Sequence, residues 1–185
     1  MTYDLPRAVC VGGKLMQIRS DYREVLEIFE ILDAEELTWP EKVALLLRQF
    51  YVLPGDIPSE SYQEAMERCL WFLRGGAEEG AKKFTRLVYW QEDFRHIIGP
   101  VNRALGSTDA RGLPYLHWWT FLSAYGEIGD CFFAHIVRAR RLEAEGGKKG
   151  KEDQRFYLEN KEIIEPRGKP GVDLEFLRKF AEGEL

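Results

Sequence analysis

The sequence predicts a mainly α-helical fold, a bundle of about six to eight helices with a small N-terminal β-hairpin packed on it. After Ser20, apolar residues recur at helical spacing in segments that glycine or proline separates. Before Ser20, the short apolar runs 8–11 and 15–18 flank Gly12-Gly13. This pattern is typical of a hairpin, because both central turn residues must take positive φ. Such a hairpin is not stable alone, so we expect it to pack on helices.

Three helices are predicted between the hairpin and residue 76. A stripe of apolar residues follows Asp21, which can cap the helix start. Residues 38–41, Thr-Trp-Pro-Glu, form a capping box that opens a helix to about Tyr51. Ser59 can cap the third helix, and Gly75-Gly76 ends it. The stripe of the first helix is Tyr22, Val25, Leu26, Phe29 and Leu32.

Later stripes predict helices over 87–105, 114–125, 131–145, 151–165 and 173–182. Gly99-Pro100 lies inside the first of these stripes, so we expect a kink or a restart there. Pro114 suits the first turn of the next helix. The glycine- and lysine-rich run 146–150 is typical of a flexible linker. We therefore predict a hairpin plus helical core domain over 1–145, and a linker with a C-terminal helical extension over 146–185.

Composition excludes several classes of protein. The chain has 185 residues, 45% apolar and 31% charged, as in ordinary soluble domains. A net charge of −5 argues against general nucleic-acid binding. No apolar run approaches the roughly 18 residues that span a membrane, and the N-terminus lacks a signal-peptide pattern. The widely spaced Cys10, Cys69 and Cys131 are expected to be buried free thiols in a reducing cytoplasm.

Catalytic motifs are not evident. Cys131 and His135 stand four residues apart and could face one metal ion, but a structural zinc site normally needs four ligands. Neither a phosphate loop nor a nucleophile elbow occurs. We therefore expect no enzymatic activity, no cofactor and no metal. A small cytosolic enzyme that uses Cys131 and His135 stays open as an alternative, because catalytic partners can meet only in space.

Aromatic residues mark the first candidate partner surface. Around Trp118, one face of the expected helix is aromatic and apolar within about a third of its circumference. The face is most simply core, but tryptophan is also enriched at interface hot spots. His117 falls opposite, as a surface or second-contact polar residue. The members of this face are Tyr115, Trp118, Trp119, Leu122 and Tyr125.

The helix expected over 131–145 is apolar on two sides, so it is either central or in contact with another chain. Phe133 and Val137 lie on one side. Ile128, Cys131, Phe132, His135, Ala139 and Leu142 lie on the other. We take Phe133, Val137, Trp118 and Phe121 as the candidate partner-binding residues.

Four segments resemble the gene product fifteen family of phages and prophages of Gram-positive bacteria. Leu-His-Trp-Trp at 116–119 is the most specific element, because such a run is rare by chance. Together the segments cover roughly residues 4–164. They are 5–23 with the hairpin, 41–51, 89–98, and 114–121 followed by 136–140.

The resemblance implies a role in tail morphogenesis. Proteins of this kind are encoded near the tail-tube and tape-measure genes, which implies a tail assembly chaperone that keeps the tape measure protein soluble before tube polymerisation. Such a chaperone would work in the host bacterial cytoplasm and be absent from the mature virion. The tail-tube protein and a second copy of the chain are further expected partners. A structural tail-completion component of the virion is the alternative.

Overall fold

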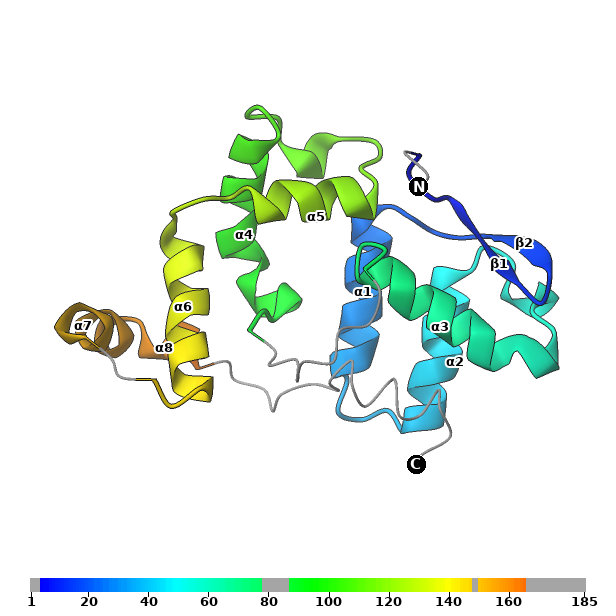
Figure 1. Cartoon of the computed structure of the whole chain (residues 1–185), viewed down its shortest axis with the longest axis horizontal. Coiled ribbons are helices and arrows are strands. Elements are labelled where there is room, and N and C mark those ends of the chain that lie inside the picture. Colours follow the sequence, from blue (N-terminus) through cyan, green and yellow to red (C-terminus); the bar gives the residue numbers. More distant parts are fainter. Residues whose placement is uncertain (1–3, 78–86, 148–149, 166–185) are drawn as a thin grey trace. The chain divides into compact units, whose positions relative to one another are not determined.

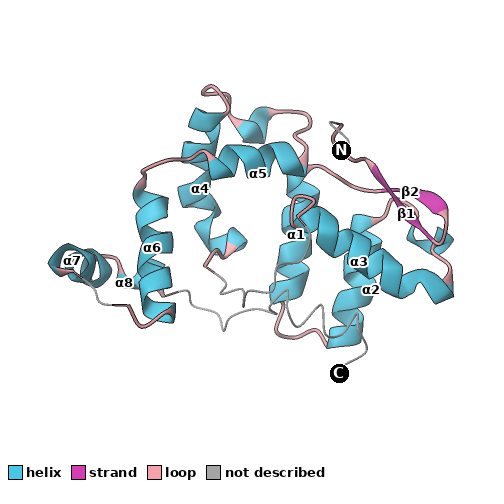
Figure 2. Cartoon of the chain, in the orientation of Figure 1, coloured by secondary structure: helices cyan, strands magenta, loops and turns pink. Residues whose placement is uncertain are grey.

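The computed structural model describes residues 4–77, 87–147 and 150–165, and it confirms the predicted fold class. These residues form eight α-helices and one two-stranded antiparallel hairpin (Figure 1, Figure 2). None of the helices in the described part combines the length and apolar composition that a membrane crossing requires.

The described residues divide into two compact units. Unit 1 holds residues 4–77 and 114–122, and unit 2 holds residues 87–113, 123–147 and 150–165. The predicted division of the chain after residue 145 stays a prediction. The helix expected over 173–182 lies outside the described residues.

The hairpin of unit 1 forms as expected. Strand β1 (Ala8–Val11) pairs antiparallel with β2 (Lys14–Gln17), and Gly12 and Gly13 turn the chain at φ +55° and +74°. Alternate side chains are buried, which is why so short a hairpin is stable: Val9, Val11 and Met16 are each 6% exposed or less. The Gly12 N–H donates to the Glu64 carboxylate of helix α3 at 2.8 Å.

Three helices follow with most of the expected caps. Helix α1 (Tyr22–Asp33) begins after Asp21, whose carboxylate accepts the Arg23 N–H. Helix α2 (Trp39–Phe50) begins after Thr38, whose N–H donates to Glu41. Helix α3 (Tyr62–Leu73) ends at Gly75 and Gly76, both with positive φ. The expected Ser59 cap was wrong, because Ser59–Ser61 forms a 3-10 turn and α3 begins only afterwards.

Helix α5 (Trp118–Gly126) begins four residues later than the sequence predicted. Residues 114–117 are instead not helical, and Leu116 and His117 pair with the start of α1. The Tyr22 N–H donates to the Leu116 carbonyl at 2.9 Å, and the Trp118 N–H donates to the Ser20 carbonyl at 2.7 Å. This pairing uses backbone groups that an earlier helix start would have committed to helical hydrogen bonds.

Both tryptophans at the start of α5 close the end of α3. The indole N–H of Trp118 donates to the Leu73 carbonyl at 3.0 Å, and that of Trp119 donates to the Phe72 carbonyl at 2.9 Å. These carbonyls lie in the last turn of α3, where the regular helical donors are missing, although the Gly75 N–H also donates to the Phe72 carbonyl at 3.0 Å. Gly76 is required beside them, because a Cβ there would lie 2.7 Å from the Trp119 ring. Trp118 is 1% exposed, so its expected place in the core is confirmed.

Unit 2 contains helices α4 (Trp90–Ala104), α6 (Phe132–Ala144), α7 (Lys151–Glu159) and α8 (Lys161–Ile164), with a 3-10 turn at Ala110–Gly112. The expected restart at Gly99-Pro100 was wrong, because α4 runs on through both residues. The helix expected over 151–165 is divided at Asn160 into α7 and α8.

A buried ion pair joins three helices of unit 2. Arg140 of α6 and Asp93 of α4 are 6% and 1% exposed, and two hydrogen bonds of 2.6 and 3.0 Å connect them. The other guanidinium hydrogens donate to the carbonyls of Leu87, Ile163 and Ile164. All five N–H donors of Arg140 are therefore used, which a buried guanidinium requires.

The indole cap of α3 predicts a specific loss of stability. Trp118→Phe keeps most of the ring but leaves the buried Leu73 carbonyl without its donor, which should cost about 1–3 kcal/mol. Trp71→Phe is the matched control, because the Trp71 N–H makes no hydrogen bond within the described part of the chain. Urea unfolding of both variants measures the difference. Equal losses for the two would show that the cap contributes nothing.

Asp93→Asn should destabilise unit 2 by about 3–5 kcal/mol, because it leaves the buried Arg140 charge without a counterion. The comparison is Arg155→Ala, which removes an exposed ion pair with Glu159 and should change stability little. Thermal unfolding followed by circular dichroism measures both. A loss for Asp93→Asn no larger than that for Arg155→Ala would contradict the central role of the pair.

Candidate functional site

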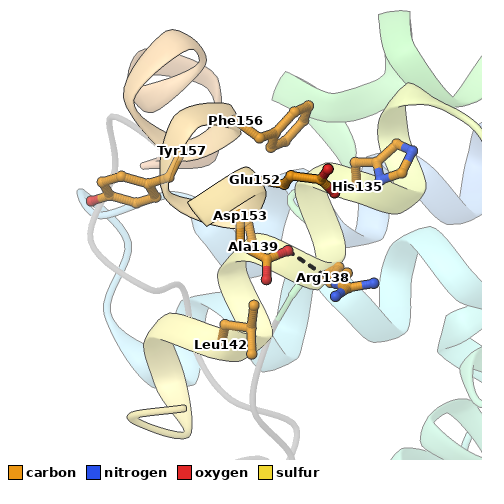
Figure 3. Close-up of a pocket in the computed structure, with 8 residues that line it drawn as sticks. All are labelled: His135, Arg138, Ala139, Leu142, Glu152, Asp153, Phe156 and Tyr157. Atoms are coloured by element: carbon orange, nitrogen blue, oxygen red, sulfur yellow. Dashed lines mark ion pairs between the residues drawn. The ribbon is translucent and has the colours of Figure 1, made fainter. Parts of the chain in front are cut away.

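Helices α6 and α7 enclose an open groove in unit 2 (Figure 3). Its volume is about 300 Å³. Its lining combines apolar side chains with charged ones at the rim. The lining residues are His135, Arg138, Ala139, Leu142, Glu152, Asp153, Phe156 and Tyr157.

Helical spacing explains how the sequence builds this groove. On α6, residues 135, 138, 139 and 142 are three or four positions apart, so they lie on one side of the helix. On α7, Asp153 and Phe156 have the same relation. The ring of Phe156 lies against His135, with 5.6 Å between the centroids, and against Phe132 at 5.9 Å. These ring contacts connect α6 with α7.

The rim of the groove is charged. Arg138 Nε lies 3.4 Å from Asp153 Oδ1, and His135 Nε2 lies 3.1 Å from Asp130 Oδ1. Figure 3 shows Glu152 on the α7 side, and this exposed carboxylate makes no ion pair with another described residue. An apolar floor with a charged rim is suited to hold an apolar side chain of another polypeptide and to orient it.

The sequence-based candidate residues fall largely in the core. Trp118, Phe121 and Phe133 are at most 1% exposed, and Val137 is half-buried. A side chain enclosed in this way offers no free docking surface in the single chain. Their role in partner binding stays a prediction. The neighbouring Phe132 is 44% exposed instead, and it shares the α6 face on which Ala139 and Leu142 line the groove.

The spacing of the α6 face could have identified the groove. Phe132, His135, Ala139 and Leu142 repeat at intervals of three or four residues, which is the signal of one helix side. Which of the two apolar sides faces the core depends on α4 and α8, and α6 packs against both. The sequence of α6 alone does not contain that information.

Among the described residues, no hydrogen bond connects the side chains of Cys131 and His135. Cys131 is half-buried just before α6, while His135 contacts Phe156 and pairs with Asp130. Within the described residues, no cluster of three or more His, Cys, Asp or Glu side chains could hold a metal ion. All three cysteines are free, but only Cys69 is fully buried, and burial raises the pKa of its thiol. The expectation of a buried thiol was therefore wrong for the exposed Cys10.

His117 is buried in unit 1, contrary to the expectation of a surface residue. It is 2% exposed. Its Nδ1 accepts the Trp119 N–H at 3.0 Å and so caps the start of α5. The Nε2 atom must then carry the proton, which it donates to the Pro6 carbonyl at 2.9 Å. Burial lowers the pKa of His117, and the charge of Arg7 lowers it further, although the bond to Pro6 opposes both.

Fold and groove together define a small, mainly helical protein with an open groove that has apolar and charged lining residues. The family model described as "Bacteriophage Gp15 protein" matches residues 1–89. Residues 1–89 are therefore similar to this bacteriophage family, in agreement with the resemblance, and the similarity suggests a phage structural or morphogenesis protein. The matched residues 1–89 contain the first two of the four resembling segments, 5–23 and 41–51. The third segment, 89–98, begins at the last matched residue. No curated protein and no solved structure matches the chain significantly.

The buried imidazole predicts acid sensitivity. The folded chain binds a proton at His117 less readily than the unfolded chain does, so stability should fall as pH decreases below about 6.5. Burial also lowers the pKa of His96, which contributes with the same sign. His117→Asn keeps a side-chain acceptor for the Trp119 N–H and should therefore reduce the pH dependence without abolishing it.

Urea unfolding at pH 7.5 and pH 5.5 measures this effect, with His135→Asn as the comparison at an exposed histidine. Stability that declines equally with pH in His117→Asn and in the unaltered protein would rule out His117 as a source.

Proposed function

We propose that this protein is a tail assembly chaperone that binds the tape measure protein before the tail tube polymerises. The groove between α6 and α7 carries the proposal, because it is an exposed surface with a lining suited to a polypeptide. The similarity of residues 1–89 to a bacteriophage family supports the phage context. In this role the protein acts in the host cytoplasm without catalysis, and it is absent from the mature virion. The tail-tube protein is a second possible partner.

A helical partner suits this groove. Ala139, Leu142 and Phe156 offer an apolar floor for side chains that project from one face of an amphipathic helix. The Arg138–Asp153 ion pair and Glu152 at the rim can hydrogen-bond to polar residues that flank those side chains. A long helical protein repeats such a face many times, so several chaperone copies could coat one partner.

The size of the groove implies weak binding at each contact. A volume of about 300 Å³ accommodates only one or two large apolar side chains. Full burial of one such side chain is worth about 1.5–3 kcal/mol. Weak individual contacts suit a chaperone, because tube subunits must displace it during assembly. Many contacts along one partner would still keep that partner covered.

Co-expression with the tape measure protein of the same phage tests the proposal. The tape measure should become soluble and co-purify with this protein, and Leu142→Asp should reduce the recovered complex at least tenfold by charging the groove floor. Leu15→Asp is the matched control, because Leu15 is a 77% exposed leucine on the hairpin of unit 1 and does not line the groove. The control should retain the complex.

Three outcomes would oppose the proposal. The tape measure could stay insoluble, the two proteins could fail to co-purify, or Leu142→Asp could bind as well as Leu15→Asp. Mass spectrometry of purified particles addresses the alternative role in the virion, since a tail-completion component would be present at stoichiometric amounts and a chaperone would not.

A further inference from the structure

Helix α7 carries an exposed leucine on the side opposite the groove. Leu158 is 75% exposed, whereas Phe156, two residues earlier, lines the groove. Two residues on an α-helix correspond to a rotation of about 200°, so the two side chains point in nearly opposite directions. One helix therefore presents an apolar projection on one side and one wall of an apolar groove on the other.

The charges around the two features are complementary. Lys151 lies seven positions and Arg155 three positions before Leu158, so all three residues are on the same side of α7. Both basic residues are exposed. Arg155 pairs with Glu159, while Lys151 makes no ion pair with another described residue. At the groove rim, the exposed Glu152 carboxylate is likewise without a described ion-pair partner. Lys151 on the Leu158 side of α7 thus has the charge opposite to that of Glu152 beside the groove.

We propose that the groove binds Leu158 of a second copy of this chain. The leucine side chain would contact Ala139, Leu142 and Phe156, and Lys151 of the incoming copy would lie near Glu152 of the receiving copy. Projection and groove lie on opposite sides of α7, so each copy can donate one and receive one. The contact is therefore head-to-tail, and such contacts produce rings or open filaments rather than only closed dimers.

The two proposed occupants of the groove exclude each other. A helical partner seated on Ala139 and Leu142 leaves no room for Leu158 of a second copy. Binding of such a partner would therefore dissociate the self-assembled protein into single copies. Only this dissociation by a bound partner rests on the proposed function. The self-association does not require it.

Sedimentation velocity over a concentration series of the full chain tests the self-association. The average mass should rise with concentration beyond two copies. Leu158→Asp removes the projection and Leu142→Asp blocks the groove, so each variant alone should associate at least tenfold more weakly. Leu15→Asp should associate as the unaltered protein does.

Mixing the two variants gives the sharpest test. Leu142→Asp keeps an intact Leu158, and Leu158→Asp keeps an intact groove, so an equimolar mixture should form a dimer that grows no further. Glu152→Lys is a second groove variant, in case Leu142→Asp does not fold. It changes only an exposed rim residue and should also weaken association. Circular dichroism verifies the fold of each variant.

Several results would overturn this proposal. A single-copy mass at every concentration, unchanged association of Leu158→Asp, or a mixture of folded variants that stays monomeric would each do so. Association that stops at two copies in the unaltered protein would indicate a symmetric contact instead. These experiments contain only this protein, so their failure would leave the proposed binding of the tape measure to be judged separately.

Discussion

The carbonyl oxygens in the last turn of a helix have no partner within that helix, and burial makes each unpaired one costly. This constraint governs how both units are built, because donors far along the chain satisfy it. Lys42, for example, is 6% exposed and donates to the Leu32 carbonyl at 2.8 Å. The donors are Lys42 for α1, Arg19 for α2, the indoles of Trp118 and Trp119 for α3, and Arg140 for α8.

This arrangement gives the specific Leu-His-Trp-Trp run a structural role. His117 caps α5 and holds the N-terminal segment through Pro6, while both tryptophans close α3. Trp118 and Phe121, which suggested a docking surface, are thus buried in the core of unit 1. In unit 2, Arg140 places α6 against α4 and α8, so the remaining face of α6 meets α7 and forms the groove.

The candidate site could be predicted only in part. Two apolar sides on α6 were evident from spacing, and one of them contains Phe132, Ala139 and Leu142. Phe133 was preferred as a contact residue, yet it is fully buried. Both sides carry apolar residues, so the choice depends on the helices that pack against α6 and on the Arg140–Asp93 pair. The groove also needs Phe156, which approaches only when α7 folds back.

Local sequence determined the helical class, the glycine turn of the hairpin, the caps at Asp21 and Thr38, and the glycine end of α3. These features depend on residues within a few positions of one another, so their chemistry is contained in short segments. Tertiary structure decided the late start of α5 at Trp118, the burial of His117 and the side of α6 that stays open. Each of these depends on hydrogen bonds or packing between segments distant in sequence, and such partners are chosen only when the chain is folded.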